Sequence, residues 1–237
     1  MSSVSSGLPN WSDAVPYVSP PVAAGISIVG AYPGFAKKTA LQLERPVPKV
    51  NVALFKSAIK AAPSLGAAVG AQMIGQKVVE DLVKSGDAQA NTTEMVTSSA
   101  LVGGLSAYPL SVFNAQTAGK SLRESVQPPK MRVLGAITGR EINFLTSVRL
   151  SEPVSKQMRE KYGDNIFVDQ VSKFGTGVLG SLAGHPGDTA ATCWQNNVSI
   201  NGGLRQLARG SATRAIASGG FSVGYNLVKD GLAKLAD

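Results

Sequence analysis

The sequence is poor in the side chains on which most enzymes and metal sites depend. Its 237 residues include one cysteine, Cys193, and one histidine, His185. A single cysteine excludes an internal disulfide bond, and so few soft ligands leave no cluster with the spacing of a metal site. We therefore expect no metal site and no catalytic residues, and we expect that the protein is not an enzyme.

Charged and aromatic residues are also scarce. Charged residues make up 16 % and aromatic residues 6 % of the chain, whereas about 25 % of the residues in an ordinary soluble domain are charged. The formal net charge is nevertheless +8, and the basic residues mostly flank uncharged stretches, where they can reach lipid headgroups. No basic run with interleaved aromatic residues occurs, which argues against nucleic acid as a partner. Mean hydropathy is only +0.07, so a soluble helical protein is the alternative to a membrane protein.

A threefold repeat is what the sequence does contain. Three similar tripeptides each close an uncharged stretch rich in small residues: Ala31-Tyr32-Pro33, Ala107-Tyr108-Pro109 and Gly184-His185-Pro186. The three prolines lie 76 and 77 residues apart, which is the length of a folding unit. The uncharged stretches hold 23, 25 and 14 residues, and about 20 residues of helix cross a bilayer core. A proline inside a helix removes a hydrogen bond, so we expect kinks at Pro33, Pro109 and Pro186.

A second apolar segment completes each repeat. These segments run over residues 51–84, 132–161 and 203–234. Two segments in each of three repeats predict an all-α membrane protein with six transmembrane helices in three pseudo-symmetric repeats. We place the boundaries at an N-terminal extension 1–18 and repeats 19–86, 87–163 and 164–237.

Charged residues follow two of the three prolines at fixed distances. Asp188 lies two residues after Pro186, and Lys38 lies five residues after Pro33. A glutamine stands nine residues after each of these prolines, at Gln42 and Gln195. A basic residue also stands early in each second segment; these residues are Lys60, Arg140 and Arg214. In register over three repeats, these motifs resemble the mitochondrial carrier family, as a shortened and degenerate member, over about residues 21–235.

The resemblance implies a ring of ion pairs that closes one end of the bundle. In that family the acid of each repeat meets the base of the next repeat. The acid positions here hold Phe35, Ser111 and Asp188, and the base positions hold Lys38, Asn114 and Ala191. Asp188 and Lys38 are therefore the one gate ion pair that the resemblance allows. A static structural pair is the alternative interpretation of these two charges.

The resemblance also implies a substrate site near the middle of the membrane. The corresponding residues are Lys60, Arg140, Glu141 and Arg214. Converging cations would attract a carboxylate or a phosphate, and Glu141 would meet an ammonium group. The alternative is that Lys60 and Arg214 reach lipid headgroups while Arg140 and Glu141 pair with each other.

Two functions follow from these features. The gate charges are mostly missing, and the connectors leave little room for the family's surface helix between two spans. These features favour a non-transporting structural or accessory subunit of a larger membrane complex. The respiratory chain is the natural candidate. The retained basic residues favour a solute carrier that exchanges a small anionic or amino-acid-like metabolite. Either protein would be a multi-pass protein of the mitochondrial inner membrane.

The expected surroundings are the same for both functions. We expect contact with membrane lipid and with other membrane subunits, a small anionic or zwitterionic solute for the carrier, and no nucleic acid. No cofactor is expected, and cardiolipin is the candidate bound lipid. The N-terminal residues resemble neither a mitochondrial presequence nor a secretory signal, so targeting information would be internal.

Overall fold

The protein is helical throughout the part of the chain that its structure describes. The computed structural model describes residues 11–83 and 92–235, and no strand occurs among them. The six long helices are α1 (Trp11–Gln42), α2 (Val52–Val83), α3 (Thr92–Thr117), α5 (Met131–Tyr162), α6 (Ile166–Gln195) and α8 (Ser211–Lys234). The expected all-α class is confirmed.

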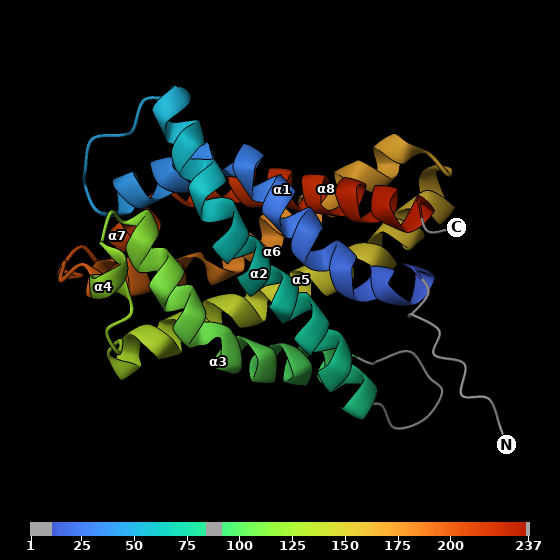
Figure 1. Cartoon of the computed structure of the whole chain (residues 1–237), viewed down its shortest axis with the longest axis horizontal. Coiled ribbons are helices and arrows are strands. Elements are labelled where there is room, and N and C mark those ends of the chain that lie inside the picture. Colours follow the sequence, from blue (N-terminus) through green and yellow to red (C-terminus); the bar gives the residue numbers. More distant parts are fainter. Residues whose placement is uncertain (1–10, 84–91, 236–237) are drawn as a thin grey trace, which may run out of the picture.

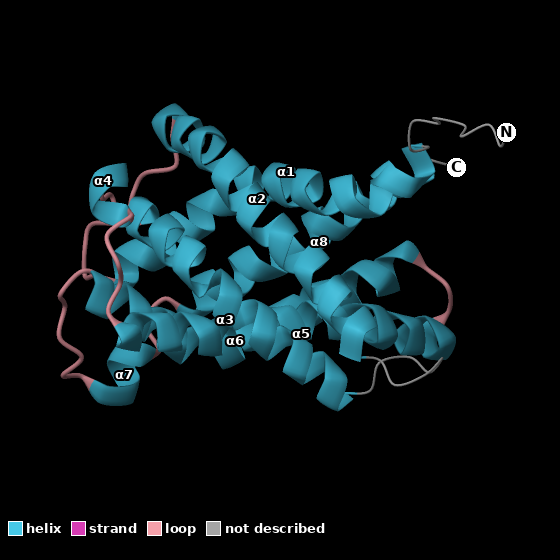
Figure 2. Ribbon diagram, turned by 60° about the horizontal axis from the view of Figure 1, so that its bottom comes forward, coloured by secondary structure: helices cyan, strands magenta, loops and turns pink. Residues whose placement is uncertain are grey.

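The long helices close into a ring in which each packs against two others (Figure 1). Helix α1 lies between α2 and α8, α3 lies between α2 and α5, and α6 lies between α5 and α8. Consecutive long helices thus form three pairs, one for each sequence repeat. The short helices α4 (Leu122–Ser125) and α7 (Gly203–Leu207) lie at one end of the bundle, and α1 begins and α8 ends at the other (Figure 2).

The helix ends follow the predicted segments closely in two repeats and depart from them in the third. Helices α2 and α5 each begin and end within one residue of the predicted segments. In the third repeat the predicted segment 203–234 is divided into two helices. Helix α7 forms its beginning, and α8 begins only at Ser211. Gly210 between them has φ +77°, a left-handed conformation that ends a right-handed helix and that glycine adopts without strain.

The first helix begins earlier than the expected boundary at residue 18. Helix α1 starts at Trp11, so the N-terminal extension is shorter than we expected. The rest of the extension, residues 1–10, and the boundary at 86 both lie outside the described residues.

The connectors, which we expected to leave little room for a surface helix, hold short helices in two repeats. Helix α4 fits into the connector of the second repeat with four residues, and α7 fits into that of the third with five. Ser121 and Glu124 form a capping box: the Ser121 N–H donates to Glu124 Oε2 at 2.9 Å, and the Glu124 N–H donates to Ser121 Oγ at 3.4 Å. The hydrogen bonds that Ser121 donates through its hydroxyl and its backbone lower the pKa of Glu124.

The interior of the bundle is unusually polar. Among the described residues, buried polar and charged residues outnumber buried hydrophobic ones. Large hydrophobic residues stand outside instead, including Leu82 and Leu105, each 80 % exposed, and Leu179, 68 % exposed. This distribution is the reverse of that in soluble proteins, where leucine is mostly buried and charged residues are mostly exposed.

Hydropathy singles out only one helix as a candidate membrane span. Among the described residues, Thr93–Ala115 in α3 is long and apolar enough to cross a membrane. A single helix of this kind also occurs in the cores of soluble proteins, so it does not by itself place the chain in a membrane. Hydropathy therefore does not show six membrane spans.

Glycines allow the closest helix crossings. A Cβ atom at Gly66 on α2 would lie 2.8 Å from the Cα atom of Gly25 on α1. On α6, a Cβ atom at Gly184 would lie 3.0 Å from the backbone oxygen of Arg140 on α5. The second crossing brings Arg140 to within one helical turn of Asp188 along α6.

We predict that Gly66→Ala lowers stability, because the added methyl group forces α1 and α2 apart. Overpacking of this kind costs about 1–3 kcal/mol. The matched control is Gly30→Ala on α1, where a Cβ atom would meet nothing within 4 Å. The control should gain up to about 1 kcal/mol of helix propensity. Thermal unfolding midpoints of the purified proteins check this, and equal shifts for both variants would contradict the crossing.

Candidate functional site

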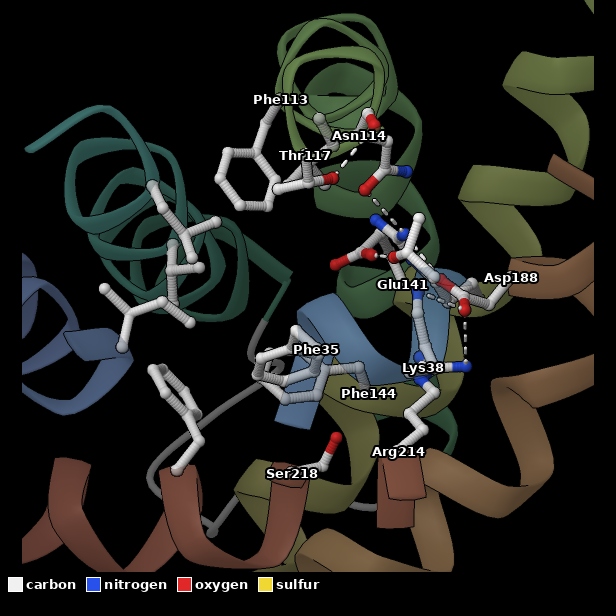
Figure 3. A pocket seen from close by; sticks show the side chains of 17 residues that line it. Phe35, Lys38, Phe113, Asn114, Thr117, Glu141, Phe144, Asp188, Arg214 and Ser218 are labelled. Atoms are coloured by element: carbon white, nitrogen blue, oxygen red, sulfur yellow. Dashed lines mark hydrogen bonds and ion pairs between the residues drawn. The ribbon is translucent and has the colours of Figure 1, made fainter. Parts of the chain in front are cut away.

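The inward faces of all six long helices surround one cavity of about 100 Å³ (Figure 3). Its polar lining consists of Lys38, Thr39, Asn114, Thr117, Arg140, Glu141, Asp188, Arg214 and Ser218. Helices α1, α3, α5, α6 and α8 supply these residues, and α2 supplies apolar ones. The cavity is therefore a joint product of the three repeats.

Asp188 is the centre of the charged cluster. Its Oδ2 atom accepts hydrogen bonds from Lys38 Nζ at 2.8 Å and from Gln42 Nε2 at 2.9 Å. Its Oδ1 atom accepts one from Arg140 Nη1 at 2.9 Å, and Arg214 Nη1 lies 3.9 Å from Oδ2. The side chains of the four charged residues are each less than 10 % exposed. One carboxylate thus holds three cations from three different helices.

Glu141 extends the network to the remaining two helices. It forms an ion pair with its neighbour Arg140 and accepts a hydrogen bond from Gln72 Nε2 on α2 at 3.0 Å. Gln72 also bonds Ser106 on α3 at 2.7 Å, and Arg140 Nη1 reaches Asn114 Oδ1 on α3 at 3.3 Å. A single connected polar network therefore joins all six long helices.

The charges in this network do not balance. Three cations, Lys38, Arg140 and Arg214, face two anions, Asp188 and Glu141. Nη1 of Arg214 is buried and has no hydrogen-bond partner among the described residues. A buried, incompletely paired charge is costly, so a further anion in the cavity would stabilise the site.

The structure brings together most of the residues singled out in the sequence. Lys38 and Asp188 are in direct contact, and Arg140, Glu141 and Arg214 line the same cavity. Arg140 and Glu141 also pair with each other, but Arg214 is buried beside Asp188, so its expected alternative place among lipid headgroups is wrong.

Lys60 does not belong to the site. It is exposed on α2 and does not line the cavity. At about 100° of rotation per residue, nine residues place Lys60 on the face of α2 opposite Val69, which lines the cavity. Its assignment as a substrate residue is corrected for this reason.

Two of the four gate positions without charge, Phe35 and Ser111, take part in other contacts. Phe35 lines the apolar part of the cavity. Gln195 Nε2 donates to the backbone oxygen of Ser111 at 2.6 Å and so ties α6 to α3. Pro33, Pro109 and Pro186 all fall inside long helices, and the kinks expected at them are still a prediction.

Sequence reasoning missed Gln72. It is 2 % exposed and connects α2 to both α3 and α5. The available signal was its helical spacing, three residues after Val69 and seven after Leu65, which places it on the buried face of α2.

Among the described residues, no group of three or more His, Cys, Asp or Glu side chains could hold a metal ion. Aliphatic, aromatic and charged groups are what the cavity offers, and they suit the binding of a small organic anion.

Comparison with known proteins adds no second line of evidence. A scan against protein-family models finds no match, and a search of the curated proteins finds none either. The geometry of the cavity and the carrier-like motifs are therefore the basis for a function.

We predict that Asp188→Asn strongly destabilises the protein, because three buried cations then face only Glu141. Removing one partner of a buried ion pair costs about 3–5 kcal/mol. The matched control is Asp230→Asn on α8, whose carboxylate lies 3.4 Å from Lys173 but is 46 % exposed. An exposed pair contributes about 0–1 kcal/mol. Thermal or denaturant unfolding measures both, and a small loss for Asp188→Asn would contradict the central role of this carboxylate.

Proposed function

We propose that the protein is a six-span membrane protein of the mitochondrial carrier fold whose central cavity binds a small monoanionic solute. The observation that carries the proposal is the excess of one positive charge around the cavity, where no described residue forms a hydrogen bond with Nη1 of Arg214. A carboxylate placed there would neutralise the network and complete the hydrogen bonding of Arg214.

The distribution of residues supports the membrane location. Large hydrophobic residues such as Leu82, Leu105 and Leu179 are exposed on the outside of the ring, while many serines, threonines and charged residues are buried inside it. A bundle in lipid needs an apolar exterior, and polar groups within it face the interior or a water-filled cavity. The mitochondrial inner membrane is proposed on the carrier-like motifs.

Binding of a solute in a closed ring of helices is the step that a carrier needs. Alternating access requires a central site around which the repeats rock. The cavity lies at the inward faces of all three repeats, and Arg140, Glu141 and Arg214 stand at positions where carriers bind substrate. We therefore favour exchange of a small anionic or amino-acid-like metabolite.

A second candidate function is a non-transporting structural or accessory subunit of a larger membrane complex. Its supporting observation is that gate and binding site share one carboxylate: Asp188 holds both Lys38 of the gate and Arg140 of the site. Opening the bundle would separate several buried charges at once, at several kcal/mol per ion. Such a network suits a rigid scaffold.

We predict that Arg214→Gln weakens acetate binding by at least about tenfold, the loss expected for one charge-assisted hydrogen bond. Isothermal titration calorimetry on the purified protein measures it. Folding should survive, because the network then holds two cations and two anions. Arg205→Gln on α7, an exposed site, is the matched control and should bind acetate as the unaltered protein does. Equal affinities for all three proteins would rule out this site.

Transport and the structural role predict opposite results in one pair of measurements. As a carrier, the protein in liposomes takes up labelled keto acids or amino acids above background, and Arg140→Ala abolishes uptake because it removes a cation from the cavity. Arg205→Ala leaves uptake unchanged. Background uptake of every solute class, together with migration in a large complex on native gels, would establish the structural role instead.

A further inference from the structure

The cavity has a second wall that the charged network does not explain. Four phenylalanines also line the cavity, Phe35, Phe113, Phe144 and Phe221, and they pack in one cluster with Leu65 and Val69. Figure 3 shows Phe35, Phe113 and Phe144 on the side of the cavity away from Asp188. The four rings come from α1, α3, α5 and α8, and the aliphatic residues come from α2. The cavity is therefore divided into a cationic side and an aromatic side.

The aromatic wall is held in place by packing. The rings of Phe144 and Phe221 lie 6.3 Å apart between centroids, and Phe221 lies 6.0 Å from Tyr225. Phe221 and Tyr225 are each 5 % exposed and belong to a buried cluster with Leu65 and Val69.

Helix α8 joins the two sides along one face. Arg214, Ser218 and Phe221 stand at positions i, i+4 and i+7 and all line the cavity. Along this face the cavity is lined by a cation, then a hydroxyl and then a phenyl ring. At the rise of an α-helix, the seven-residue step covers about 10 Å along the helix axis. The Ser218 hydroxyl points into the space between the two walls (Figure 3).

The two walls restrict the ligand in different ways. Three cations and two anions give the network one net positive charge, which a single negative charge neutralises. A dicarboxylate or a nucleotide would place a second negative charge against the phenyl rings, where it would lose hydration without gaining a partner. An apolar group binds favourably there instead, and each buried carbon raises the affinity roughly fourfold. The volume of about 100 Å³ suits roughly four carbon atoms, since a cavity of about 150 Å³ holds benzene.

We infer that the ligand of this cavity is a short monocarboxylate with a compact apolar group. Its carboxylate meets Arg214, and its alkyl group packs on the phenylalanine wall. This inference rests on the anion binding proposed above and specifies the class of the anion.

Four small probes test it on the unaltered protein by isothermal titration calorimetry: acetate, isobutyrate, isobutyramide and malonate. Isobutyrate adds two buried carbons to acetate and should bind roughly fifteenfold more tightly. Isobutyramide keeps the shape but lacks the charge, and malonate adds a second charge, so both should bind at least about tenfold more weakly than isobutyrate.

The outcomes separate this inference from the proposed function. If acetate and isobutyrate bind equally and both depend on Arg214, anion binding stands and the apolar specificity is wrong. If malonate binds as tightly as isobutyrate, the monocarboxylate class is also wrong. If none of the four probes binds, the proposed function itself fails.

A pair of variants locates the apolar wall. Phe113→Gln on α3 should reduce the preference for isobutyrate over acetate by about fourfold or more, because it replaces a ring of the wall by an amide. Phe167→Gln, at a 71 % exposed ring on α6, should alter neither affinity. Unfolding midpoints verify that both variants fold, and an unchanged preference in Phe113→Gln would overturn the placement of the alkyl group.

Discussion

The carboxylate of Asp188 makes this arrangement of helices feasible. Lys38, Arg140 and Arg214 approach it from α1, α5 and α8, and each is buried. Three buried cations would repel one another and would each lose several kcal/mol of hydration. A single carboxylate between them offsets both effects, and Gly184, one turn before it, lets α5 and α6 approach closely enough for the contact.

The rest of the interior follows from this constraint. Because one carboxylate cannot fully satisfy three cations, Glu141 also pairs with Arg140 and is itself held by Gln72. Arg214 keeps one nitrogen without a hydrogen-bond partner among the described residues. The residual charge lies beside a wall of phenylalanines, so the cavity combines a site for an anion with a surface for an alkyl group. The residues proposed to bind the solute also hold the bundle together. A carrier must separate these buried charges, whereas a scaffold keeps them paired.

Much of the fold could be predicted from the sequence because its signals are local and repeated. The spacing of the tyrosine-proline motifs and the apolar segments predicted two long helices in each repeat, and the ends of α2 and α5 agree within one residue. The start of α8 could not be predicted as well, because a left-handed Gly210 interrupts an otherwise continuous segment. For the site, the carrier-like motifs paired Asp188 with Lys38, and the two residues are in contact. Lys60 lies outside the cavity, and its spacing of nine residues from Val69 was the signal that places it on the opposite face of α2.

The sequence by itself determined the all-helical class and the repeat, because these depend on composition and on periodicity along the chain. The charges that line the cavity were singled out by motifs that resemble those of the carrier family. Only the tertiary structure decided which charges meet. Asp188 and Lys38 are separated by 150 residues, and the convergence of Arg140 and Arg214 on the same carboxylate depends on the angles and depths at which six helices pack. The aromatic wall likewise exists only in three dimensions, because each of its rings comes from a different helix.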